Sequence, residues 1–110
     1  MSRKRAAVIF HPLRPTVQLL QDAVPIIVPN SHCAPRYMPG EIIFVSPKAP
    51  IRPGDFIYGE DSQERGVSRF LGECDGMIDI EFFEPWDGQT RLIFPRKPDI
   101  ILRRIIGTAH

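Results

Sequence analysis

The sequence predicts an all-β domain, a small antiparallel and partly closed barrel of about seven short strands. Three observations lead to this fold class. The chain has 12 prolines in 110 residues, and proline breaks both helix interiors and central strands. Short apolar runs recur along the chain, and turn signals that contain Gly, Pro or Asp-Gly separate them. Short strands at regular spacing with such turns are typical of small antiparallel sheets and barrels.

The length of the chain fits a single domain. Residues 1–24 are predicted to form a basic start and a connector, and residues 25–110 to form the β domain. Within the connector, VQLLQDAV at 17–24 lies between Pro15 and Pro25 and fits two turns of helix.

From Pro25 onward the pattern is that of strands. PIIVP at 25–29 is a short apolar strand between prolines. GEIIFVS at 40–46 places apolar side chains on both of its faces, which predicts a central strand. A proline-rich turn follows, and FIYGE at 56–60 is the next strand.

The second half of the chain alternates strands with hairpin signals. DSQERG at 61–66 is a polar hairpin loop, Asp75-Gly76 indicates a type I′ turn, and Asp87-Gly88 is a further Asp-Gly turn. Along 77–84, Ile78, Ile80 and Phe82 alternate with Asp79, Glu81 and Phe83, which predicts a strand. The remaining strands are expected at 67–73, 77–84, 91–95 and 100–108.

The charge balance does not indicate a nucleic-acid-binding protein. The formal net charge is +1, which gives no general attraction to a polyanion. The run Arg3, Lys4 and Arg5 could contact phosphate, but a solvated terminus is the simpler interpretation. The later arginines are predicted to lie on a solvated face, namely Arg91, Arg96, Arg103 and Arg104.

Cysteine and histidine are too sparse for a metal or disulfide site. Cys33 and Cys74 cannot build a disulfide framework or a structural zinc site, and the three histidines show no ligand spacing. We therefore expect reduced thiols, no metal and no cofactor. No run approaches the ~18 apolar residues of a membrane span, and the N-terminus lacks the apolar core of a signal peptide. The sequence thus predicts a cytoplasmic location without membrane contact.

The segment NSHCAPRYMPGEIIFVSPKAPIRPGDFIYGE, residues 30–60, carries a family resemblance. It resembles the serine peptidase domains of the LexA and phage-repressor group, the S24 family. Those domains show Ser-Met-x-Pro, a spacer, Gly-Asp or Gly-Glu and a strand, then Arg-Pro-Gly-Asp and a second strand. The closing ILRRIIGTAH and the EFFEPWDG run are also similar, so the resemblance covers about residues 25–110. It implies the LexA/signal-peptidase-like fold.

The resemblance implies a Ser–Lys dyad, and this chain departs from it at both positions. With Pro35 aligned to the family's proline, the serine position holds His32, the methionine position holds Cys33, and the lysine position holds Ser68. A serine nucleophile needs a base, and neighbouring Arg69 cannot supply one because a guanidinium stays protonated. The chain also lacks the Ala-Gly or Cys-Gly bond at which such proteins cut themselves.

Three other arrangements of reactive groups stay open at this point. Ser68 and His32 could work as nucleophile and base in exchanged places. Ser31, one position before His32, could be brought into place by a bulge. Cys33 could attack as a thiolate with His32 as its base, although neighbours on a strand point to opposite faces. In each case a polar loop residue beside a strand is the simpler interpretation.

The expected function is therefore binding. We expect a catalytically inactive S24-peptidase-like dimerisation or protein-interaction module in phage- or prophage-type transcription regulation. Its partner would be a second copy, or a LexA- or phage-repressor-like protein. The final strand, with Ile100–Leu102 and Ile105–Ile106, is either the edge for this pairing or part of the core. The alternative function is an active self-cleaving or peptide-cleaving hydrolase that uses Ser31, Cys33 or Ser68.

Overall fold

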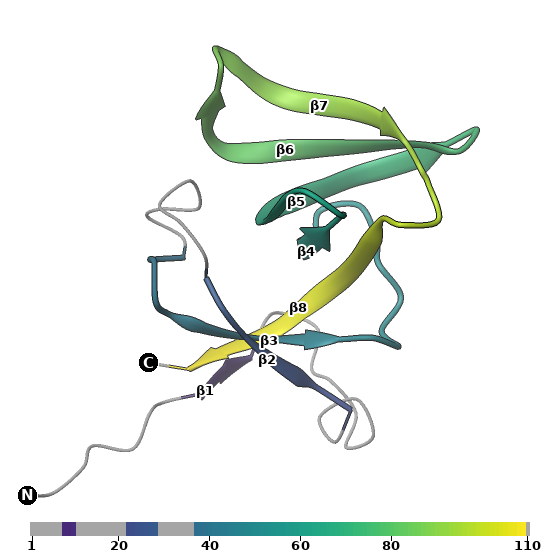
Figure 1. Cartoon of the computed structure of the whole chain (residues 1–110). Coiled ribbons are helices and arrows are strands. Elements are labelled where there is room, and N and C mark those ends of the chain that lie inside the picture. Colours follow the sequence, from purple (N-terminus) through teal and green to yellow (C-terminus); the bar gives the residue numbers. More distant parts are fainter. Residues whose placement is uncertain (1–7, 11–21, 29–36, 110) are drawn as a thin grey trace, which may run out of the picture.

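The computed structural model describes residues 8–10, 22–28 and 37–109. These residues form one antiparallel sheet (Figure 1). Seven strands follow the order β2-β3-β8-β4-β5-β6-β7, and β1 pairs with β8 off this path. The strands are β1 (Val8–Phe10), β2 (Val24–Ile27), β3 (Ile42–Ser46), β4 (Phe56–Glu60), β5 (Arg65–Cys74), β6 (Met77–Trp86), β7 (Gln89–Pro95) and β8 (Ile101–Ala109).

The prediction of a small antiparallel all-β fold is confirmed, but closure into a barrel is not observed. The path ends at β2 on one side and at β7 on the other, and these two strands do not pair with each other. In Figure 1 β4 to β7 lie at one end of the molecule, β1, β2 and β3 lie at the other, and β8 runs between them. The described residues contain no helix that is long and apolar enough to cross a membrane.

Most of the predicted strands are found close to their expected positions. β3 occupies the strand predicted at 40–46, and it is central because it lies between β2 and β8. β4 matches the prediction at both ends. β1 was not predicted, since its three residues fall in the expected connector. Of the helix predicted at 17–24, residues 17–21 lie outside the described residues, and Val24 begins β2.

The two Asp-Gly turns adopt the conformation that their sequence requires. Asp75 and Gly76 have φ values of 51° and 75°, and Asp87 and Gly88 have the same pair of values. Positive φ at both central residues is the mark of the type I′ turn, whose twist matches that of the flanking strands. These turns join β5 to β6 and β6 to β7.

The final strand is part of the core and not an edge. β8 pairs with β4 through residues 101–104 and with β3 through residues 104–109. Ile105 and Ile106 are each only 1 % exposed. The register with β3 shifts here, since Phe44 pairs with Gly107 and Val45 pairs with Ile105, which leaves Ile106 as an extra residue of β8. The alternative in which β8 is the pairing edge is therefore wrong.

Two apolar clusters form the core, on opposite faces of β4 and β5. On β4, Tyr58 belongs to the first cluster and Ile57 to the second. On β5, Val67 belongs to the first cluster and Phe70 to the second. Successive side chains of a strand point to opposite faces, so both faces of these strands are covered. The first cluster comprises Val28, Tyr37, Ile43, Val45, Tyr58, Val67 and Ile105. The second comprises Ile57, Phe70, Ile78 and Ile80.

The prediction that the late arginines share a solvated face is wrong for Arg104. Its side chain is buried on β8, and its Nε lies 3.6 Å from Asp55 Oδ2. Arg91 and Arg96 are exposed as predicted, and they pair with Asp79 and Glu73 respectively. Arg104 differs because it lies where β8 faces both Ser46 of β3 and Ile57 of β4.

Candidate functional site

The predicted reactive residues are only partly described. Ser31, His32 and Cys33 lie outside the described residues, and so does the basic run Arg3–Arg5. Ser68 is described, and Arg69 beside it is exposed. Of His32 and Ser68, the two residues that the resemblance aligns with a dyad, the structure therefore describes only Ser68.

Ser68 lies on β5 in apolar surroundings. It is 7 % exposed, and it pairs across the strands with Ile57. Phe70, two residues further on, shares its face of the sheet, and both Ile57 and Phe70 belong to the second cluster. Arg69 points to the other face, where its guanidinium lies 3.8 Å from Glu81. Arg69, the cationic neighbour of Ser68 on β5, therefore does not share the face of the sheet on which Ser68 lies.

Two buried residues flank the segment that carries Ser31, His32 and Cys33. Val28 precedes this segment and Tyr37 follows it, and both belong to the first cluster. The Val28 N–H donates to the Glu41 carbonyl at 2.8 Å, and the Gly40 N–H donates to the Val28 carbonyl at 3.1 Å. The described residues on both sides of the segment therefore belong to the same core cluster.

Tyr37, the first described residue after this segment, could not be identified as part of the site from the sequence. Its ring contacts Phe56 edge-on with centroids 6.0 Å apart, and contacts Phe83 in the same way at 5.9 Å. Phe56 and Phe83 are themselves 5.3 Å apart. The three rings come from a loop and from two strands that are not adjacent in the sheet. Only the aromatic character of each residue could have indicated this group.

A groove of about 850 Å³ lies on the side of the sheet where Ser68 is found. Its apolar lining comes from β6, β7 and the first residues of β8, namely Ile80, Phe82, Leu92, Phe94 and Leu102. Ser68 also lines it. The alternation along 77–84 indicates that Ile80 and Phe82 share a face, but it does not indicate that β8 faces them.

Charged residues surround this apolar lining. Asp61 and Glu64 come from the β4–β5 turn, and Lys97 and Asp99 come from the β7–β8 connection. The Asp61 carboxylate accepts the N–H groups of Gln63 at 2.8 Å and Glu64 at 2.7 Å. These two hydrogen bonds lower the pKa of Asp61, and the positive charge of Lys97 lowers this pKa further. The two connections thus approach each other at the mouth of the groove.

The turn at Asp61 predicts a pH dependence of stability. Because the folded-state pKa is lowered, the contribution of Asp61 is fully present above its unfolded pKa of about 3.9. It is lost as the pH falls through the folded-state pKa. Asp61→Asn keeps an oxygen acceptor but cannot titrate, so its unfolding free energy should fall less steeply with acid than that of the wild type. Urea denaturation between about pH 5 and about pH 2 measures this difference, and superimposable profiles would contradict the assignment.

A second titratable group lies at the other face of β4. The Tyr58 hydroxyl donates a hydrogen bond of 2.9 Å to Glu60 Oε1. Burial raises the pKa of Tyr58, and the bond to Glu60 and its negative charge raise this pKa further. Tyr58 therefore stays protonated at neutral pH and acts as a hydrogen-bond donor, not as a base.

The described residues do not bring together a metal-binding cluster. Among residues 8–10, 22–28 and 37–109, no three His, Cys, Asp or Glu side chains are placed to hold a metal ion. What this part of the chain does bring together is an apolar groove, its charged margin and the exposed strand β7.

Comparison of the chain with protein-family models, with curated protein sequences and with solved structures gives no significant match. The candidate site therefore rests on the geometry described above.

Proposed function

We propose that this chain is a catalytically inactive domain of the LexA/signal-peptidase-like fold that acts by binding other protein chains. It serves as a dimerisation or protein-interaction module in phage- or prophage-type transcription regulation. Such a module works in the cytoplasm, where the regulated DNA is. The observation that carries the proposal is the open edge of the sheet at β7, beside the groove.

β7 has the features of an edge strand that can pair with another chain. It pairs with β6 on one side, and no described strand pairs with its other side. Leu92 is 41 % exposed and Ile93 is 58 % exposed. An edge strand leaves a row of N–H and C=O groups ready to bond to another chain, and soluble proteins usually protect such an edge. Pairing with a second chain would satisfy these groups and cover both side chains.

The position of Ser68 supports the absence of peptidase chemistry. The family resemblance implies a lysine here, which would act as the base for a serine nucleophile. A buried serine between Ile57 and Phe70 cannot take that role, because its hydroxyl is a far weaker base than a neutral amine. The arrangement keeps the packing of the sheet and omits the basic group.

The regulatory effect follows from the number of DNA-binding arms in the complex. A repressor of this group binds DNA through two linked arms, and linkage raises the overall affinity above that of one arm. If this chain replaces one copy in such a dimer, the mixed dimer has one arm fewer. The module would thus weaken repression without contacting DNA.

Sedimentation velocity tests the interaction. We expect the wild-type chain to sediment as a dimer in a concentration-dependent manner. The double variant Leu92→Lys, Ile93→Lys should weaken this dimer by at least about tenfold, because it places charge on both faces of the edge strand. Both side chains are partly exposed in the single chain, so the variant should keep the circular dichroism spectrum of the wild type and an unfolding midpoint close to that of the wild type.

The control is a substitution of similar kind away from β7. Val24, on the opposite edge strand β2, is 38 % exposed, and Val24→Lys should leave the dimer unchanged. Equal weakening by the β2 and β7 variants would locate the interaction elsewhere. A wild type that stays monomeric at all concentrations would contradict the self-pairing that we propose.

A further inference from the structure

We propose that the groove beside β7 binds the basic segment Arg3–Arg5 of a second copy of this chain. This inference rests on the proposed function, since it names the partner and the site of self-pairing. Four properties of the described residues support it: the charge of the groove, its aromatic lining, the register of β1, and the length of β8.

The groove has a clear excess of negative charge. Its lining includes two cationic residues, Arg65 and Lys97. The acidic residues of the lining are more numerous, namely Glu60, Asp61, Glu64, Asp87 and Asp99. The low pKa of Asp61 keeps that carboxylate ionised at neutral pH. A cationic segment is therefore attracted to this groove, whereas a nucleic acid is repelled from it.

The lining suits arginine in particular. Phe82 and Phe94 both line the groove, and a guanidinium packs favourably over an aromatic face. Leu92 and Leu102 offer apolar surface for the methylene stems of Arg and Lys side chains, which bury their stems while the charged end stays near water or a carboxylate. A run of three consecutive cationic residues, Arg3, Lys4 and Arg5, matches this combination.

The register of β1 shows that the segment of the same chain cannot fill the groove. Val8 faces Ala109 and Phe10 faces Gly107, so at Val8 the chain enters from beyond the C-terminal end of β8. The groove lies at the other end of β8, beside Leu102. The eight steps from Ile101 to Ala109 span roughly 26 Å. Arg3, the residue of the run farthest from Val8, precedes it by five residues, which allows a main-chain reach of only about 17 Å.

The occupant must therefore come from another copy. The simplest arrangement is a two-fold symmetric dimer, in which the β1 end of each copy lies beside the groove of the other. Each copy then gives its segment and receives that of its partner. The exchange brings each segment next to the unpaired edge of β7, so the same contact covers the exposed edge.

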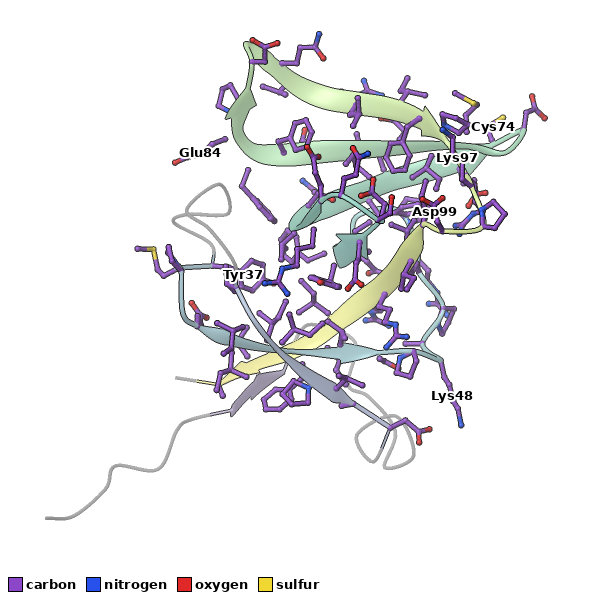
Figure 2. All side chains as sticks on the ribbon, viewed as in Figure 1. Tyr37, Lys48, Cys74, Glu84, Lys97 and Asp99 are labelled. Atoms are coloured by element: carbon purple, nitrogen blue, oxygen red, sulfur yellow. The ribbon has the colours of Figure 1, made fainter. Side chains whose placement is uncertain are left out.

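Charge reversal on each side of the contact tests the proposal. The groove variant is Glu64→Lys, Asp99→Lys, and the segment variant is Arg3→Glu, Lys4→Glu, Arg5→Glu. Each should weaken the dimer by at least about tenfold in sedimentation velocity, and a chain that carries both sets should recover to within about threefold of the wild type. Glu84→Lys is the matched control and should have no effect. Figure 2 shows Glu84 on the opposite side of this region from Lys97 and Asp99.

The possible outcomes separate this inference from the proposed function. If the wild type is a dimer and neither reversal weakens it, the module self-associates but the groove is not where the segment binds. If the wild type is monomeric, self-pairing fails, and a fluorescein-labelled peptide of residues 2–10 decides the inference. Saturable binding of this peptide that the groove variant abolishes would support it, and no binding would overturn it. If the wild type binds DNA and the segment variant loses this binding while its dimer stays intact, the inference would also be overturned.

Discussion

Replacing Tyr37 by alanine is expected to lower the free energy of unfolding by about 3 to 5 kcal/mol. Tyr37 is 1 % exposed, and it packs edge-on against Phe56 and Phe83. Truncation leaves a cavity in the first cluster, and it removes two aromatic contacts that are each worth about 0.5 to 1.5 kcal/mol beyond burial. Urea denaturation followed by circular dichroism measures the loss.

Tyr37→Phe is the matched control, because it keeps the ring and removes only the hydroxyl. Its cost should be about 1 kcal/mol, the size of one hydrogen bond. A loss below about 1 kcal/mol for Tyr37→Ala would mean that this aromatic group does not fix the residues after the 29–36 segment.

Replacing Arg104 by methionine is the second large expected effect, a loss of about 3 kcal/mol. Arg104 and Asp55 form a mostly buried ion pair at 3.6 Å. Asp55 Oδ2 also accepts the Arg52 N–H at 2.7 Å, which holds the Arg52-Pro53-Gly54-Asp55 turn. Removing the guanidinium leaves a carboxylate in the interior with one main-chain donor. An uncompensated buried charge costs more than the net gain from an intact pair.

Adding Asp55→Asn to Arg104→Met distinguishes this explanation from lost packing. The asparagine oxygen can still accept the Arg52 N–H, but the residue carries no charge. We expect the double variant to recover at least about half of the loss seen in Arg104→Met. If the two losses simply add, the effect of Arg104 comes from its packing between β3 and β4 and not from its charge.

Local features of the fold could be predicted from the sequence because neighbouring residues decide them. Asp75-Gly76 and Asp87-Gly88 place residues that tolerate positive φ side by side, and both turns are found where they were predicted. The same holds for β3 and β4, whose apolar runs are bounded by Pro-Gly and Pro-rich turns.

Features that depend on distant partners could not be predicted. Val8–Phe10 is a strand only because β8, about a hundred residues later, pairs with it. Arg104 looks like a surface residue in the sequence, and its burial follows from the position of β8 between β3 and β4. Alternation shows which residues share a face, but it does not show which strand will cover that face.

The same limit applies to the candidate site. Ser68 is a candidate because of its place in a family pattern, and the sequence does not reveal that it lines a groove with Phe82 and Leu102. The aromatic group around Tyr37 joins a loop with two strands, and no spacing rule connects these residues. Acidic residues from the β4–β5 turn and the β7–β8 connection meet only through the sheet order.

The central claim is that the chain binds and does not cut. Active-site labelling followed by mass spectrometry tests this claim most directly. We expect a fluorophosphonate probe to leave Ser31 and Ser68 unmodified, and iodoacetamide to react with Cys33 no faster than with Cys74, the exposed free thiol that serves as an internal control. Rapid labelling of one of these serines at one probe per chain, or selective labelling of Cys33 over Cys74, would contradict the account.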